Sequence, residues 1–408
     1  MPLPSVEAVR KGHGRLTFQE AMRLIALPDK VADDGKVIRR YMSRRKVWIT
    51  GDDLKPLAYE MGARNFKSGT SAYGGHVYGQ AALAASRAFR ASQTADGNNS
   101  LEDKKLGIHT IHGYFSEAGR EDRPFIYEVI TLASNALFPN LLVTVRQPTS
   151  PSTGPELDYY PLSDADMPLG PVCFSALVSF RPASITQLDV QEPPPQRRFA
   201  EILASRKPRE WDPAPITDIE GILSMIPGAR KAVGLFAGLE MRKVDMRGWN
   251  EGKPIHERRE IILYRLLAPL AEEAGGGSVG EDGPDGPDAH IAAHAYGADR
   301  NGLLMIGNHA GFGRELARAA SLSYSFVVHV DAADAVMRHE GEGNEYDQWW
   351  IQETSFPRLQ AGRGIVHCKI WSPSGVHVAT EYQDGIIRRT PRPGDKGQYG
   401  RGKPAVML

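Results

Sequence analysis

Two stretches of the chain share one order of elements, in which a helix rich in small residues is followed by strands. In the first stretch, Gly74-Gly75 leads into an alanine-rich segment that predicts a helix from His76 to about Arg90. Apolar and polar residues then alternate, which predicts strands near residues 109–115, 125–132, 141–146 and 172–180. This order predicts an α+β unit whose sheet wraps the helix.

The second stretch repeats the order from Leu239 onward. A strand at Leu239 and another over 258–267 precede a helix for which Asp288 is the expected N-cap. Further alternating segments predict strands near residues 321–330, 349–354, 364–371 and 376–387. We therefore expect two similar α+β units along one chain.

The chain before the first long helix carries shorter signals. Thr17-Phe18-Gln19-Glu20 has the spacing of a capping box, which predicts a short amphipathic helix over 21–27. Residues 31–46 are basic and are expected at the surface, and residues 46–50 predict a strand.

A local repeat in the sequence supports a duplication. His76-Val77-Tyr78-Gly79-Gln80-Ala81 returns as His294-Ala295-Tyr296-Gly297-Ala298-Asp299, an offset of 218 residues (294 minus 76). We divide the chain into a first domain over 1–185, a proline-rich linker over 186–238, a second domain over 239–390 and a flexible tail over 391–408. Residues 274–287, rich in glycine, aspartate and proline, predict a mobile surface loop.

Composition narrows the class of protein. The 408 residues are enough for two cores, and 49 basic against 49 acidic side chains give no reason to expect a nucleic-acid partner. We expect neither a signal peptide nor a membrane span, because no apolar run has the necessary length. These features and the two cysteines favour the cytoplasm. The C-terminal residues do not form a peroxisomal tripeptide, although a peroxisomal location stays open.

Three polar residues of the second domain stand at positions where a core is expected. Asp299 shares a helical face with Leu303, and a buried carboxylate is costly unless it has a partner. Ser321 begins a strand with hydroxyl groups on one face, and Gln383 stands where the first domain has Val178. The alternative to a catalytic role is that these side chains only cap or pair within the fold.

No cofactor and no metal are expected. The chain contains neither Cys-x-x-Cys nor His-Glu-x-x-His, and His109 and His112 would point to opposite faces of a strand. The glycines at 275–280 lack the preceding strand and following helix that a dinucleotide or nucleophile-elbow motif requires.

Several of these segments together resemble the type II acyl-CoA thioesterases. The first domain supplies Tyr73-Gly74-Gly75-His76-Val77-Tyr78-Gly79-Gln80-Ala81, then His112-Gly113-Tyr114-Phe115 and Arg123-Pro124-Phe125. The second supplies Ala298-Asp299-Arg300-Asn301, the strand over 320–325, and Tyr382-Gln383-Asp384-Gly385. The matching segments span 15–185 and 239–390 in the order of the family. The resemblance implies a double hotdog fold, with two tandem units that each wrap an antiparallel sheet around a long helix.

The resemblance also implies a site and a reaction. The family's catalytic aspartate, threonine or serine, and glutamine fall on Asp299, Ser321 and Gln383. The implied reaction is hydrolysis of a fatty or related acyl-CoA to free acid and CoA, with Asp299 as the base and the other two residues holding the water. Backbone N–H groups at the helix start would polarise the carbonyl group. Within the matching segments, the residues expected to bind substrate are Gly74, Gly75, His76, His112 and Tyr324.

Two other functions stay open at this point. A hotdog enoyl-CoA hydratase would pair an aspartate with a histidine, and His294 lies on the same helix as Asp299. A non-catalytic acyl-binding protein would use the three residues only to satisfy buried polar groups. The sequence decides neither the length of the acyl chain nor whether the protein is a monomer or a homo-oligomer.

Overall fold

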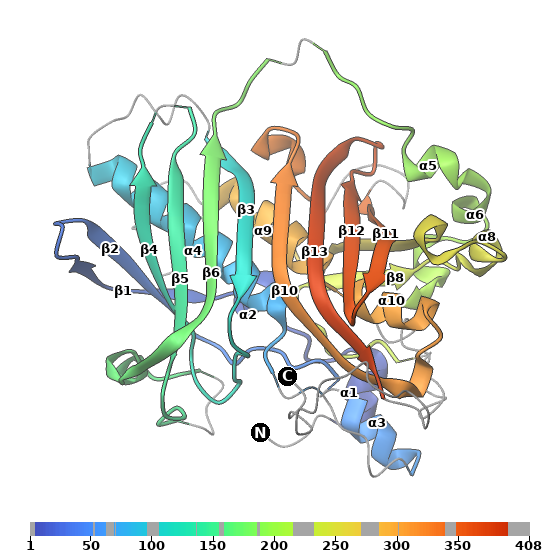
Figure 1. Cartoon of the computed structure of the whole chain (residues 1–408), viewed down its shortest axis with the longest axis horizontal. Coiled ribbons are helices and arrows are strands. Elements are labelled where there is room, and N and C mark those ends of the chain that lie inside the picture. Colours follow the sequence, from blue (N-terminus) through green and yellow to red (C-terminus); the bar gives the residue numbers. More distant parts are fainter. Residues whose placement is uncertain are drawn as a thin grey trace.

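The fold is built on one large antiparallel sheet. The computed structural model describes residues 5–51, 54–62, 69, 71–95, 106–135, 137–154, 159–185, 188–214, 232–270, 285–300, 302–338 and 348–390. Within these residues, 13 strands form a single continuous sheet (Figure 1).

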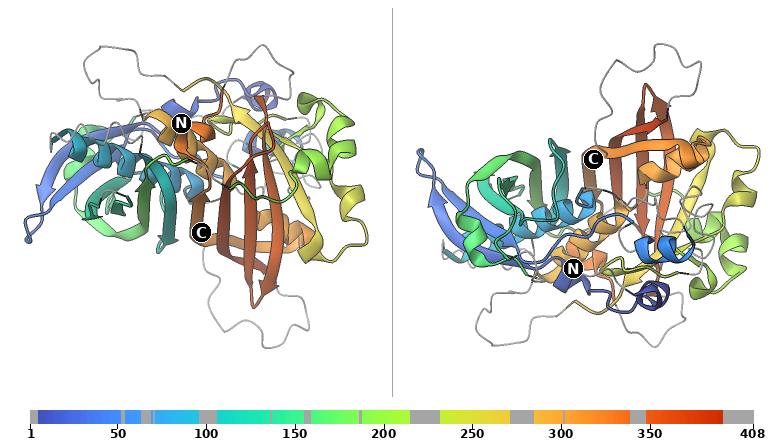
Figure 2. Two further views of the ribbon diagram at one scale, coloured as in Figure 1. Left: turned by 90° about the horizontal axis from the view of Figure 1, so that it is seen from above. Right: turned by 90° about the horizontal axis from the view of Figure 1, so that it is seen from below.

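The first half of the sheet comes from the N-terminal part of the chain and curves around one long helix (Figure 2). The helix is α4 (Gly74–Ala95), the predicted helix of small residues with one more turn at its end. Each strand predicted after this helix is present, and two strands precede it. The strands are β1 (Leu24–Val31), β2 (Val37–Ser43), β3 (Gly107–Phe115), β4 (Ile126–Ala133), β5 (Asn140–Pro148) and β6 (Leu169–Arg181).

The second half comes from the C-terminal part and contains the second predicted helix, α9 (Gly286–Ala298). Each strand predicted in this stretch is also present, although several begin or end at other residues. The strands are β7 (Asp212–Pro213), β8 (Leu239–Lys243), β9 (Arg259–Leu266), β10 (Leu316–Val328), β11 (Trp350–Gln360), β12 (Arg363–Trp371) and β13 (His377–Arg389).

The two halves have the same strand order. The first half runs β1-β2-β4-β5-β6-β3, and the second, from its outer side, runs β8-β9-β11-β12-β13-β10, with β7 beyond β8. In each half the strand that follows the helix therefore lies innermost. These two inner strands, β3 and β10, pair antiparallel, with His112 opposite Ser325, and make the sheet continuous across the middle.

Shorter helices and turns surround the sheet. The helices are α1 (Val6–Lys11), α2 (Phe18–Ala21), α3 (Lys55–Glu60), α5 (Pro195–Arg198), α6 (Ala200–Ala204), α8 (Arg247–Asn250) and α10 (Gly302–His309). Turns of 3₁₀ helix span Leu162–Asp166, Pro208–Glu210, Ile255–Glu257, Gly313–Glu315 and Ala332–Ala335. Among the described helices, none is both long and apolar enough to cross a membrane.

Two predicted segments fall largely or wholly outside the described residues. The expected loop over 274–287 lies outside them as far as residue 284, and its last two residues belong to the first turn of α9. The expected tail over 391–408 lies wholly outside them.

Residues 24–27 of the segment predicted as a helix over 21–27 belong to a strand instead. The capping box at Thr17 is present, but α2 ends at Ala21 and the chain continues as β1. Pro28 directly follows this segment and biases the residue before it toward extended backbone, and pairing with β2 satisfies the backbone of the segment. An edge strand tolerates proline, and β1 has an irregular register between Leu27 and Lys30. The strand expected over 46–50 is also absent, and β2 forms earlier, within the segment expected at the surface.

Asp288 is not the N-cap of α9, which begins two residues earlier, at Gly286. Its carboxylate instead accepts hydrogen bonds from the Ile108 N–H at 2.8 Å and from the Ser86 hydroxyl at 2.5 Å. Asp288 is buried, and Arg90 lies 3.3 Å from it. This carboxylate therefore joins α9 to both α4 and β3.

The two long helices pack closely against each other. The Tyr73 hydroxyl donates to the Tyr296 carbonyl at 2.6 Å. A Cβ atom added at Gly75 would lie 2.8 Å from that same carbonyl oxygen and 2.7 Å from the Tyr73 ring. A Cβ added at Gly79, one turn later, would lie 3.5 Å from the Ala292 carbonyl oxygen, an ordinary contact distance. The close approach of the helices therefore depends on Gly75 and not on Gly79.

Gly75→Ala and Gly79→Ala are expected to have opposite effects on stability. The added methyl group at Gly75 forces α4 and α9 apart and should lower the free energy of unfolding by about 1–3 kcal/mol. At Gly79 the methyl group fits, and the gain in helix propensity should raise the free energy of unfolding by roughly 0.5–1 kcal/mol. Urea unfolding of both variants measures the difference, and equal effects would contradict the proposed packing.

Candidate active site

A β-bulge in β10 brings two hydroxyl groups to the same side of the sheet. The register between β10 and β13 shifts between Ser321 and Ser323, so β10 has one extra residue there. Residues three apart on a regular strand point to opposite faces, but the extra residue lets Ser321 and Tyr324 point the same way. Their hydroxyl oxygens lie 3.0 Å apart.

Gln383 connects these hydroxyls to Asp299. It lies directly opposite Tyr324 in the pairing of β10 with β13. Its Nε2 atom donates to Asp299 Oδ1 at 2.9 Å and lies 3.0 Å from Ser321 Oγ. The same Nε2 atom also contacts the Tyr324 hydroxyl. The structure thus brings together Asp299, Ser321 and Gln383, the three residues expected to be catalytic, and adds Tyr324 to them.

The first half of the molecule contributes the remaining contact to Asp299. The Gly75 N–H, in the first turn of α4, donates to Asp299 Oδ2 at 2.5 Å. A helix N-terminus favours negative charge, so this contact stabilises the carboxylate form. A Cβ at Gly74 would lie 3.2 Å from the same oxygen, so a side chain there would crowd the contact. The polar cluster of Asp299, Ser321, Tyr324 and Gln383 therefore depends on both halves.

Burial brings the pKa of Asp299 into the range in which a carboxyl group can act as a base at neutral pH. Asp299 is 8% exposed, and removal of its charge from water raises the pKa of the carboxyl group to about 7. The Gly75 N–H, the Arg300 charge and the Gln383 amide oppose that rise. Arg300 was not predicted as part of the site. Its guanidinium lies over the ring of Trp48, 4.2 Å from the ring centre, and holds a positive charge beside the carboxylate.

Two histidines predicted to bind substrate do not join the polar cluster. His112 lies opposite Ser325, on the face of the sheet away from Tyr324, and its Nδ1 atom lies 3.0 Å from Ser325 Oγ. His76 is buried, and burial lowers the pKa of its imidazole to about 3, with Gln80 within hydrogen-bonding reach. Gln80 accepts from the Tyr127 hydroxyl of β4, so His76 lies on the side of α4 that faces the first half's own sheet.

His294, the histidine that a hydratase would use, is part of the core. Its Nδ1 atom lies 2.6 Å from the Tyr264 hydroxyl, and its Nε2 atom lies 2.8 Å from the Ala335 carbonyl oxygen. Burial lowers the pKa of its imidazole to about 3. Both ring nitrogens are therefore occupied by core groups and not by Asp299.

Sequence reasoning missed a buried carboxyl group next to the cluster. Glu381 lies two residues before Gln383 on β13 and is 1% exposed. Neither of its carboxyl oxygens has a hydrogen-bond partner among the described residues. The alternation along 376–383 already places Glu381 on the same face as Gln383, so the signal was present in the sequence.

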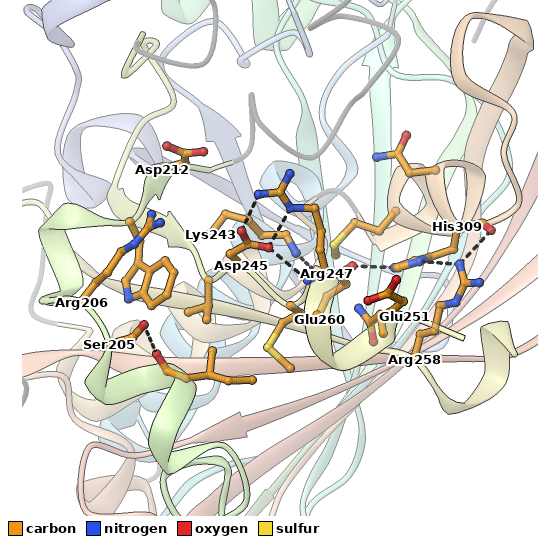
Figure 3. A pocket seen from close by; sticks show the side chains of 18 of the residues that line it. Ser205, Arg206, Asp212, Lys243, Asp245, Arg247, Glu251, Arg258, Glu260 and His309 are labelled. Atoms are coloured by element: carbon orange, nitrogen blue, oxygen red, sulfur yellow. Dashed lines mark hydrogen bonds and ion pairs between the residues drawn. The ribbon is translucent and has the colours of Figure 1, made fainter. Parts of the chain in front are cut away.

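A separate cavity of about 1270 Å³ lies at the outer side of the second half, among α6, β8, α8 and α10 (Figure 3). Side chains of both charges line it. Glu260 lies between Lys243 and His309, and the His309 Nε2 atom is 2.6 Å from its carboxylate. None of the polar-cluster residues lines this cavity. Among the described residues, no group of three His, Cys, Asp or Glu side chains is placed to hold a metal ion.

Comparison with solved structures identifies the fold. Acyl-CoA thioesterase II from Mycobacterium marinum is similar over 93% of this chain and 99% of its own, with a TM-score of 0.51 and 19% sequence identity. A protein of unknown function with a hotdog fold, from Alicyclobacillus acidocaldarius, covers 92% and 98% of the two chains at 14% identity, with a TM-score of 0.47. The dehydratase domain of RzxB from Pseudomonas fluorescens covers 88% and 96% at 10% identity, with a TM-score of 0.39.

The resemblance found in the sequence is therefore confirmed at the level of the fold. The chain shares the fold of acyl-CoA thioesterase II from Mycobacterium marinum. No protein-family model and no curated protein matches the chain.

The pKa of Asp299 predicts a pH-dependent effect of Asp299→Asn on stability. Above about pH 4 the unfolded chain ionises Asp299, whereas the folded protein keeps the proton until about pH 7. The contribution of Asp299 to the free energy of unfolding of the wild-type protein therefore falls as the pH rises. Asparagine does not titrate, so the variant has no such pH dependence. The rise of the pKa from 3.8 to about 7 corresponds to roughly 4 kcal/mol. Between pH 4 and pH 8, the free energy of unfolding of the variant should therefore rise by this amount relative to that of wild type.

Urea unfolding at several pH values measures this difference. Asp245→Asn is the control, because the hydrogen bond from Arg247 lowers the pKa of Asp245 to about 2. The stability difference between Asp245→Asn and wild type should stay constant above about pH 5. A similarly flat difference for Asp299→Asn would show that its carboxyl group is ionised in the folded protein throughout.

Proposed function

We propose that the protein is an acyl-CoA thioesterase that hydrolyses its substrate with a water molecule activated by Asp299. We further propose that it consists of two tandem hotdog units over 1–185 and 239–390, which form a double hotdog around one active site. The linker over 186–238 would join the units. Support for the two units comes from the identical strand order of the halves and the pairing of β3 with β10.

The observation that carries the proposal is the contact network of Asp299. One carboxylate oxygen accepts from Gly75 and the other from Gln383, so the group is held in one orientation. Its pKa of about 7 lets it take up a proton at neutral pH and release it again. A base of this kind is what water-mediated hydrolysis of a thioester requires.

The hydrogen atoms of the polar cluster leave one donor for the substrate. Gln383 Nε2 has two hydrogens and lies near three oxygens, so it cannot donate to all of them. The hydroxyls of Ser321 and Tyr324 carry one hydrogen each, and their mutual contact uses only one of these. The remaining hydroxyl hydrogen is available to the attacking water or to the thioester oxygen. Ser321 is half-buried and Tyr324 fully buried, so Ser321 is the one that can meet a substrate.

In the proposed reaction, the water oxygen attacks the thioester carbon while Asp299 takes the proton of the water. The negative charge that develops on the carbonyl oxygen is stabilised by the free hydroxyl donor. Collapse of this intermediate breaks the carbon–sulfur bond, and the departing thiolate of CoA takes the proton from Asp299. The Gly75 N–H was expected to polarise the carbonyl group, but it donates to Asp299 and so positions the base instead.

The position of His294 supports hydrolysis over hydration of an enoyl-CoA. Hydration on this scaffold would need a histidine beside Asp299, and His294 is bound to Tyr264 and Ala335 instead. Incubation with an enoyl-CoA distinguishes the two reactions, because hydrolysis releases a free thiol and hydration forms a 3-hydroxyacyl-CoA. Binding of acyl-CoA without either product would identify the protein as a non-catalytic acyl-binding protein.

Asp299→Asn should lower kcat for acyl-CoA hydrolysis by ~10²-fold or more, because asparagine keeps the shape and cannot act as a base. The measurement is CoA release from a panel of acyl-CoA lengths. In the wild-type protein, kcat/KM should rise with pH through about 7 as Asp299 ionises, and this rise should be absent from the residual activity of the variant.

Asp288→Asn is the matched control, since Asp288 is also buried on α9 but is bound to Ser86 and Ile108, outside the polar cluster. It should retain hydrolysis with the same pH dependence. Near-normal turnover by a folded Asp299→Asn variant would refute the role of Asp299.

A further inference from the structure

The carboxyl group of Glu381 is buried, and among the described residues it has no hydrogen-bond partner. Its residue is 1% exposed, and both oxygens lack a hydrogen bond among the described residues. Buried polar groups in folded proteins almost always have a partner, and a buried donor or acceptor left unsatisfied costs about 1–3 kcal/mol. A group of this kind next to a candidate active site suggests that its partner belongs to a ligand.

The strands place Glu381 beside the polar cluster, on its buried side. Along β13, Gln383 lies opposite Tyr324 and Val366, and Glu381 lies opposite Phe326 and Cys368. Both side chains point to the same face, and two residues of strand separate them by about 7 Å. The charge of Asp299 also acts on Glu381 and raises the pKa of its carboxyl group.

The surroundings of Glu381 favour the uncharged form of its carboxyl group. Burial, and after it the charge of Asp299, raise the pKa of Glu381 well above its usual range. The hydroxyl hydrogens of Tyr73 and Tyr78 go to the backbone carbonyls of Tyr296 and Ile111, so neither hydroxyl has a hydrogen left for Glu381. The neutral carboxyl group therefore has one O–H donor and one carbonyl acceptor, both unused.

Exposure along β10 shows in which direction a substrate would enter. Ser321 is half-buried, whereas Tyr324 and Phe326, further along the strand, are fully buried. A thioester at the polar cluster would therefore have its large, charged CoA portion on the Ser321 side. Its acyl chain would extend inward, past Gln383 and toward Glu381.

We propose that Glu381 is a specificity-determining residue that binds a hydroxyl group on the acyl chain, so that the substrates are hydroxyacyl-CoA thioesters. This inference rests on the proposed thioesterase function. A hydroxyl group is both a donor and an acceptor, and a neutral carboxyl group can pair with both at once. Glu381 lies about 7 Å beyond Gln383 along the strand. The hydroxyl group that it binds would therefore stand further along the acyl chain and not next to the thioester. An unsubstituted chain would leave the carboxyl group unsatisfied, and a site built for a hydroxyl discriminates strongly against an analogue that lacks it.

The test compares ω-hydroxyacyl-CoA thioesters of increasing chain length with unsubstituted acyl-CoA thioesters of the same lengths. For wild type, we expect kcat/KM to favour the hydroxylated substrate by roughly 10-fold or more at one chain length. Glu381→Leu should remove this preference and hydrolyse the unsubstituted substrate at least as well as wild type does. Glu381→Gln should keep part of the preference, because its amide group can still donate and accept.

Two controls separate specificity from folding. Glu260→Gln, at the separate cavity, should leave the ratio of the two kcat/KM values unchanged. Glu381→Leu should unfold at the same temperature as wild type or a higher one, because it removes an unsatisfied polar group from the core.

The outcomes also separate this inference from the proposed function. If wild type releases CoA from neither kind of substrate, the proposed function fails, and this inference fails with it. If wild type hydrolyses both substrates equally well at every chain length, or Glu381→Leu keeps the preference, the role of Glu381 is overturned while the thioesterase function stands.

Discussion

The hydrogen bond from the Gly75 N–H to Asp299 is the interaction on which the arrangement of the site depends. It joins the start of one long helix to the end of the other, so the same contact both helps to link the two halves and orients the carboxylate. It can form only because neither Gly74 nor Gly75 has a side chain to hold α4 away from α9. The residues that permit this contact and the residue that uses it come from different halves of the chain. For this reason, neither half alone could form the site.

The two halves differ at the residues of the polar cluster, and this difference explains why the chain has one such cluster and not two. The first half has Ala81 and Val178 at the positions that correspond to Asp299 and Gln383, and both are fully buried. Apolar groups there need no hydrogen-bond partners, so the first half gains packing where the second half bears the cost of burying polar groups. That cost is reduced because the members of the polar cluster bind one another.

Sequence patterns were sufficient for the strands of both repeated stretches, and they singled out three polar residues that the structure brings into contact. They failed where a tertiary contact overrides a local pattern. Asp288 has the features of an N-cap, yet β3 and α4 bind its carboxylate instead. The apolar run after Thr17 suits a helix or a strand equally, and Pro28 together with pairing to β2 decides for the strand. The bulge that turns Ser321 beside Tyr324 also depends on pairing with β13, so the sequence of β10 alone could not indicate it.

In the part of the chain that the structure describes, the sheet is continuous across β3 and β10, begins at β1 and ends at β7. Both of these border strands, β1 and β7, contain a proline, at Pro28 and Pro213. Proline has no N–H to offer to an incoming strand, and in β1 the charged residues Asp29 and Lys30 follow it directly. Growth of the sheet by addition of strands from other molecules is therefore hindered at both borders. If copies of this protein associate, we expect them to meet through the face of the sheet or through the helices.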